Sequence, residues 1–191
     1  MRGKIETAFQ ESAQVKIQFI QNEENVGKIM DVTKRILGAY RKGNKVLFFG
    51  NGGSACDASH LAAELVNRYK KDRDGLPALA LATDMAVVTS IGNDYDYTEL
   101  FSRQIKAMGN KGDVAIAIST SGNSPNVLKA VEMARQKGLI TVGFTGKDGG
   151  KLAGLVDYAF IVPSDNTARI QEAHITLGHL LCELIEDEMF K

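Results

Sequence analysis

Two short segments rich in glycine and hydroxyl side chains are the first feature of the chain that can support chemistry. They are GNGGSA at residues 50–55 and STSGNS at residues 119–124, and each follows a run of apolar residues. Glycine lets the backbone approach a ligand closely, and serine and threonine donate hydrogen bonds without a charge to desolvate. Such a cradle suits a phosphate monoester, whereas the structural alternative is that Ser124 only caps a following helix.

A second candidate for chemistry is the pair His60 and Glu64, four residues apart and therefore on one face of a helix. An imidazole and a carboxylate at this spacing can chelate a divalent ion or act as an acid/base pair, although an exposed surface pair has the same spacing. Two further histidines, His174 and His179, lie about 140° apart around an ideal helix, so they cannot both face one site.

The first loop also fits the dinucleotide-binding pattern G-x-G-x-x-G/A, through Gly50, Gly52 and Ala55. That pattern requires an acidic residue about 20 positions further on, at the end of the second strand. The nearest acidic residue at the end of that strand, Asp84, lies well beyond this distance, so we do not expect a dinucleotide site.

The elements that must position these residues follow from an alternation of apolar runs and helical segments. The apolar runs are predicted to be strands at residues 45–50, 77–83, 113–120, 139–146 and 158–163. Helices are predicted between them at residues 54–71, 98–109 and 124–138. This alternation predicts an α/β fold with a five-stranded, mostly parallel sheet flanked by helices in three layers. Ligands of such sheets bind at the carboxyl ends of the strands, where both glycine-rich loops lie.

The remaining segments are predicted to be helical. Residues 4–41 carry apolar side chains at helical intervals and are expected to form two amphipathic helices, and residues 167–189 are expected to form one long helix. The chain length favours a single domain over residues 1–191.

Composition excludes several classes of function. The 23 basic residues balance 23 acidic ones, so no net field attracts nucleic acid or an anionic membrane. Neither a signal peptide nor an apolar run of membrane-spanning length is evident, which favours a soluble protein in the cytoplasm. The two cysteines, Cys56 and Cys182, follow no metal or redox spacing and fit a reducing compartment.

Five blocks in order make the chain resemble the SIS (sugar isomerase) domain family, and specifically its bacterial phosphoheptose isomerases, over nearly its whole length. The blocks are GNGGSACDASHLAAELVNRY, SIGNDYDY, FSRQIKAMGNKGDVAIAISTSGNSPNV, FTGKDGGKLAG and ARIQEAHITLGHLLCELIEDEM. The resemblance implies a flavodoxin-like sandwich and conversion of sedoheptulose 7-phosphate to D-glycero-D-manno-heptose 7-phosphate, the first step toward heptose of lipopolysaccharide core or other surface glycans. It also implies a homotetramer with active sites near subunit interfaces, in which residues 1–42 pack in the oligomer core.

The same resemblance assigns roles to individual residues. It implies one zinc ion per subunit, held by His60, Glu64, Gln171 and His179, which leaves His174 as a bystander. It implies substrate contacts from Asn51, Gly52, Gly53, Glu64, Asn93, Asp94, Ser119, Thr120, Ser121, Ser124 and Gln171. Gln171 and His179 are eight residues apart, about 12 Å along a helix, so they meet at one ion only by reaching toward each other or by acting in sites of different subunits.

An isomerase with this site would use an enediol, with Glu64 as the base at carbon and His179 as the acid/base at the sugar oxygens. A divalent metal would polarise the carbonyl. The main alternative is a tetrameric binding module like the DnaA initiator-associating protein, which shares the loops but lacks the catalytic glutamate and histidine that Glu64 and His179 supply here. A third reading is an isomerase or sensor for another phosphosugar, such as an aminosugar 6-phosphate or a pentose phosphate.

Overall fold

The computed structural model describes residues 1–191 and contains one five-stranded sheet, in which every strand is parallel to its neighbours. The strands are β1 (Val46–Gly50), β2 (Ala78–Ala80), β3 (Val114–Ile118), β4 (Ile140–Gly146) and β5 (Tyr158–Val162). Their order is β2-β1-β3-β4-β5, as in flavodoxin-like folds, which confirms the predicted fold class. Residues of β1, β3 and β4 are almost all buried, because helices cover both faces of the sheet.

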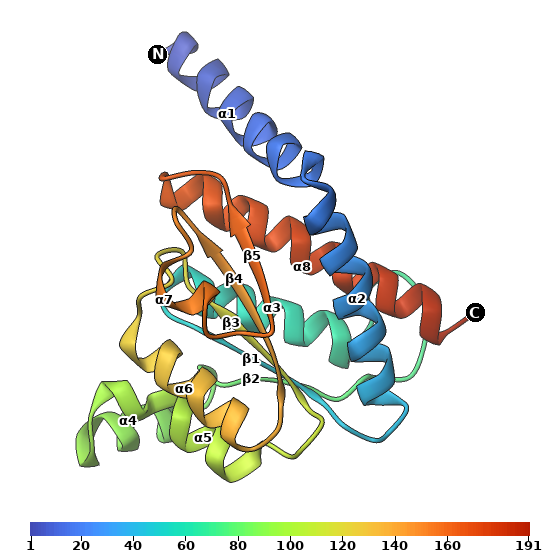
Figure 1. Ribbon diagram of the computed structural model, residues 1–191, viewed down its shortest axis with the longest axis vertical. Coiled ribbons are helices and arrows are strands. Elements are labelled where there is room, and N and C mark those ends of the chain that lie inside the picture. The colour runs from blue at the N-terminus through green and yellow to red at the C-terminus, as the bar shows by residue number, and fades with distance from the viewer.

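One face of the sheet is covered by α2 (Glu23–Tyr40), α3 (Gly53–Val66) and α8 (Thr167–Met189). The other face is covered by α4 (Met85–Asp94), α5 (Leu100–Met108), α6 (Pro125–Gln136) and the short α7 (Gly150–Ala153), with a 3₁₀ turn at Tyr97–Glu99. Two apolar cores result, one on each side of the sheet, and Figure 1 shows the three layers. None of the helices combines the length and the apolar character that crossing a bilayer requires.

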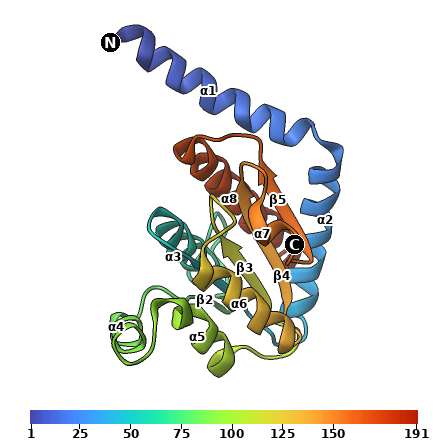
Figure 2. The same cartoon turned by 60° about the vertical axis from the view of Figure 1, so that its left-hand side comes forward.

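The first helix, α1 (Arg2–Gln21), extends away from the other elements, and both views show its N-terminal turns without a neighbour (Figures 1 and 2). It carries four large exposed apolar side chains, Ile5, Phe9, Ile17 and Ile20. The chain turns at Asn22, whose side chain accepts a hydrogen bond from the amide of Glu24 and so caps α2. The two helices predicted over residues 4–41 are therefore present.

One predicted helix is too long, and one helix was not predicted. The helix predicted over residues 54–71 ends at Val66, because the backbone of the next residues bonds to Glu186 of α8. Helix α4 was not expected, since its β-branched residues and Gly92 have low helix propensity. The signal for α4 was its cap, because the Asp84 carboxylate accepts hydrogen bonds from the amides of Ala86 and Val87.

Candidate phosphosugar and metal site

The two glycine-rich loops lie side by side because they follow β1 and β3, which are neighbours in the sheet. The chain runs from β1 to one edge of the sheet and from β3 to the other, so this is the point where ligands of such folds bind. The side chains of Asn51 and Asn126 join the loops by two hydrogen bonds, of 2.8 and 2.9 Å. Tyr97 donates a third, of 3.0 Å, to the Asn51 oxygen.

The loops present donors to a ligand. Six of their amide groups make no hydrogen bond within the chain, namely those of Asn51, Gly52, Gly53, Thr120, Ser121 and Ser124. Ser124 stands at the N-cap position of α6 but makes no side-chain capping bond, and its hydroxyl lies 3.2 Å from that of Ser119 instead. Helices α3 and α6 both begin here, so their positive ends add to the attraction of an anion. The arrangement can hold a phosphate group.

Gln171 of α8 lies against the first loop. A Cβ at Gly53 would be 2.4 Å from Nε2 of Gln171, so a larger residue there would displace the end of the Gln171 side chain. Gly53 precedes His60 by seven residues, about 10 Å along α3. The structure therefore places Gln171 where a ligand of the first loop would meet it.

Asn93 and Asp94 lie at the end of α4, exposed, and their side chains bond to each other at 2.8 Å. They make no hydrogen bond to either glycine-rich loop. Tyr97, three residues beyond Asp94, is the nearest position in the sequence whose side chain bonds to the first loop.

Three side chains from α3 and α8 form a cluster that can hold a metal ion. Nε2 of His60 lies 3.0 Å from a carboxylate oxygen of Glu64 and 3.0 Å from Nε2 of His179. The close approach depends on Gly178, because a Cβ there would lie 2.4 Å from the side chain of Leu61. A single subunit thus brings together residues that are 119 positions apart.

The donor set of the cluster fits a divalent transition metal. Two imidazole nitrogens and one carboxylate oxygen are a combination that holds catalytic zinc and leaves a position open. The three ligand atoms lie within 4.8 Å of one another. Ligand atoms about 2.1 Å from a zinc ion are about 3.4 Å apart in a tetrahedral arrangement, so only small side-chain shifts would be needed.

The third histidine, His174, lies away from this cluster and is buried. Its Nε2 is 3.0 Å from the carbonyl oxygen of Thr145, and its ring packs on Phe144. Burial lowers the pKa of His174 to about 4, although the bond to Thr145 opposes the shift. His174 is therefore neutral at physiological pH.

Sequence reasoning missed several residues around the site. Asn126 and Tyr97 hold Asn51, and the Tyr69 ring lies 5.8 Å from the His179 ring. Asp57, one turn before His60, has a buried oxygen without a hydrogen-bond partner, and burial raises its pKa against the influence of His60. The spacing of Asp57 and His60, three residues on a helix, was the available signal for that neighbour.

Comparisons with known proteins identify the family of this chain. The family model described as the SIS domain matches residues 8–146. Phosphoheptose isomerase of Thermodesulfovibrio yellowstonii is 58% identical over 191 residues, which are 100% of this chain and 94% of the relative. The Aquifex aeolicus phosphoheptose isomerase is 54% identical over 187 residues, 98% of this chain and 97% of the relative.

Solved structures of phosphoheptose isomerases also align with this chain over nearly its whole length. The structure of phosphoheptose isomerase GmhA from Neisseria gonorrhoeae aligns with a TM-score of 0.91 and 39% identity, covering 97% of this chain and 98% of the other. A phosphoheptose isomerase from Francisella tularensis aligns with a TM-score of 0.92 and 37% identity, covering 97% of both chains.

Proposed function

Because this chain belongs to the SIS-domain family and, within it, to the phosphoheptose isomerases, we propose that it converts sedoheptulose 7-phosphate into D-glycero-D-manno-heptose 7-phosphate. The chain is an aldose–ketose isomerase. The observation that supports the specific reaction is that an anion cradle and the cluster of His60, Glu64 and His179 flank the same helix, α3. We further propose that the product enters heptose synthesis for lipopolysaccharide core or other surface glycans.

In the proposed mechanism the loops bind the phosphate and leave C1 and C2 of the sugar near Glu64. The carboxylate of Glu64 removes a proton from C1 of the ketose and returns it to C2. His179 moves the second proton from the C1 oxygen to the C2 oxygen, so an enediol forms and collapses to the aldose. Both transfers are internal, and no oxidant or further reactant is required.

We propose zinc, one ion per subunit, as the cofactor. His60, Glu64 and His179 would hold it, and Gln171 is the proposed fourth ligand. Bound there, a zinc ion would supply Lewis acidity toward the sugar carbonyl. A carboxylate that a metal engages is a weaker base, so Glu64 acts as a base only when its carboxylate is released. Gln171 would need to extend along α8 from its place beside Gly53, or serve the site of another subunit.

The first test is turnover of sedoheptulose 7-phosphate by the purified protein, with and without a chelator. We expect the aldose to appear, and we expect chelation to suppress it until zinc is restored. Absence of product with metal-loaded protein would contradict the proposed reaction. Product that is insensitive to complete metal removal would take the metal out of the mechanism while leaving the isomerase in place.

A noncatalytic binding module was the main alternative from sequence. Modules like the DnaA initiator-associating protein lack the glutamate and histidine that this chain carries as Glu64 and His179. The relatives described above are isomerases by name. We therefore favour an enzyme over a noncatalytic binding module. Aminosugar or pentose phosphates remain the competing substrates, to be compared in the same assay.

We propose that the chain acts in the cytoplasm as a homotetramer with active sites near subunit interfaces and with residues 1–42 in the oligomer core. Unpaired Cys56 and Cys182 fit a reducing compartment. An apolar groove between the end of α1, α2 and α8 is lined by residues that include Ile17, Ile20 and Leu180. Apolar surface of this kind, continued along α1 by Ile5 and Phe9, favours burial against another subunit.

Phe9→Glu is expected to shift the protein from tetramer toward smaller species, because the side chain is 77% exposed in one subunit and would place a charge in the proposed core. Light scattering coupled to size exclusion measures the change. Gln10→Glu, which adds the same charge at the neighbouring exposed residue, is the matched control and should leave the mass unchanged. An unchanged tetramer in Phe9→Glu would contradict the proposed role of α1.

A further inference from the structure

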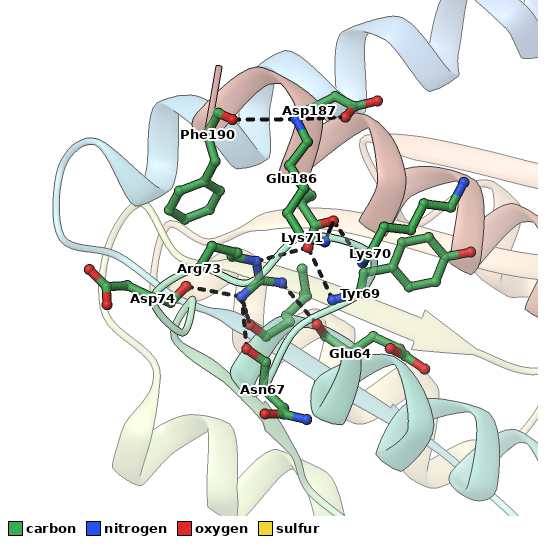
Figure 3. Close-up of polar contacts among 11 residues, drawn as sticks. Glu64, Asn67, Tyr69, Lys70, Lys71, Arg73, Asp74, Glu186, Asp187 and Phe190 are labelled. Atoms are coloured by element: carbon green, nitrogen blue, oxygen red, sulfur yellow. Dashed lines mark hydrogen bonds and ion pairs between the residues drawn. The ribbon is translucent and has the colours of Figure 1, made fainter.

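The connection that follows α3 is held against α8 by a single buried carboxylate. Both oxygens of Glu186 are saturated: one accepts from the amides of Lys70 and Lys71, each at 2.7 Å. The other accepts from the amide of Tyr69 and from Nε of Arg73, each at 3.0 Å. Figure 3 shows this carboxylate enclosed by the backbone of the connection. Burial acts to raise the pKa of Glu186, but these hydrogen bonds outweigh it and hold the pKa at about 2.

Arg73 extends the same network to the end of α3. Its guanidinium donates to the carbonyl oxygens of Glu64 at 2.9 Å and Leu65 at 2.7 Å, two of the acceptors that a helix end leaves open. It also stacks over the Phe190 ring, with 5.4 Å between the guanidinium carbon and the ring centroid. The side chains of Arg73 and Glu186 are both only 2% exposed. We call Arg73, Glu186 and the amides of residues 69–71 the clasp.

Two residues that the clasp bonds to or includes, Glu64 and Tyr69, also contribute side chains at or beside the proposed active site. Glu64, whose carbonyl accepts from Arg73, carries the carboxylate that contacts His60. Tyr69, whose amide donates to Glu186, places its ring 5.8 Å from the ring of His179. Glu186 itself follows His179 by seven residues, two helical turns, and so lies on the same face of α8 about 10 Å further along.

We propose that Arg73 and Glu186 are positioning residues of the isomerase, because the clasp fixes the end of α3 that carries Glu64 relative to the face of α8 that carries His179. This inference rests on the proposed roles of Glu64 and His179. It adds two residues that do not touch the substrate, yet determine how the proposed carbon base and the proposed oxygen acid/base lie relative to each other.

The choice of a carboxylate and a guanidinium is explained by the directed hydrogen bonds that these two groups make with the backbone. Removing two charges from water is expensive, so apolar side chains of similar volume often stabilise a fold as well as a buried ion pair does. The directed hydrogen bonds of a carboxylate and a guanidinium instead define orientation. Here they engage a connection of residues 67–77 that forms no regular element.

The test compares Glu186→Gln and Arg73→Lys with the unmodified enzyme. We expect kcat to fall about 10- to 100-fold, because small displacements of catalytic groups have effects of that size. KM should change by less than about threefold, since the phosphate cradle is untouched. A second readout is the NMR spectrum of the imidazole groups of the zinc-free protein, in which the signals of His60 and His179 should move. His174 is the internal reference, because it bonds to Thr145 on another side of α8.

Glu183→Gln is the matched control. Glu183 lies on the same helix and bonds to the side chain of Lys70, but it is partly exposed and makes no contact with the connection's backbone. It should retain both kcat and the imidazole signals. If Glu186→Gln does not fold, Arg73→Lys serves as the test. It keeps the positive charge but loses the two guanidinium hydrogen bonds to the carbonyl oxygens of Glu64 and Leu65.

A folded clasp variant with unchanged kcat and unchanged His60 and His179 signals would overturn the proposal and leave the clasp a stabilising contact. Should the unmodified protein fail to isomerise its substrate, the proposed function fails, but the imidazole signals still report whether the clasp positions the cluster. The two failures are therefore distinguishable.

Discussion

Glu64→Gln is expected to lower kcat by about 10²- to 10⁴-fold, the range that a positioned acid/base group contributes. The substitution keeps the size of the side chain and one acceptor oxygen but removes the basic carboxylate. The Glu64 side chain is 25% exposed and its carboxylate forms an ion pair only with His60, so the fold should be unaffected. Turnover of sedoheptulose 7-phosphate and circular dichroism measure the two effects.

Hydrogen exchange with solvent shows whether Glu64→Gln impairs proton removal from carbon. In deuterium oxide the unmodified enzyme should exchange the transferred C1 hydrogen of the ketose with solvent to some extent, whereas Glu64→Gln should lose this exchange together with turnover. Glu132→Gln, which neutralises an exposed glutamate on α6, is the matched control and should behave as the unmodified enzyme. Activity of Glu64→Gln within about tenfold of normal would assign the carbon base to another residue.

The second large effect separates the two histidines of α8. His179→Gln should lower kcat about 100-fold or more and weaken zinc binding, with a change in the free energy of unfolding of less than about 0.5 kcal/mol. His174→Ala should do the reverse. It removes a buried ring and leaves the Thr145 carbonyl without its partner, so it should reduce the free energy of unfolding by about 3 kcal/mol while the folded protein keeps its kcat.

Urea denaturation, zinc titration calorimetry and steady-state kinetics on both histidine variants give the comparison. Both substitutions replace a histidine of the same helix, α8, on different faces. Loss of kcat in a fully folded His174→Ala protein would show that the buried histidine has a role in catalysis. Normal kcat in His179→Gln would remove His179 from the proposed mechanism.

Much of the fold was determined by the sequence through local rules. Continuous apolar runs predicted the strands, because a strand buried on both faces has no polar side chain to alternate. Helical spacing and glycine-rich strand ends then placed the two loops at the carboxyl edge of the sheet. The i, i+4 spacing of His60 and Glu64 put both on one face of α3, as the 3.0 Å contact between them shows.

Only the tertiary structure decided the contacts between residues distant in the sequence. It brought His179 to the pair on α3, set Gln171 against Gly53, and joined the loops through Asn51 and Asn126. It also ended α3 at Val66, where helix propensity would have continued, because Glu186 offers the backbone of residues 69–71 a better acceptor than water.

There is a physical reason why the sequence displays the local elements but not the contacts between distant residues. Helix and strand formation depend on hydrogen bonds and side-chain spacing within a few residues, which a sequence displays directly. The meeting of α3 and α8 depends on how closely two surfaces pack, here on the absence of a side chain at Gly178 beside Leu61. The sequence therefore determined which residues can do chemistry, and packing decided which of them share a site.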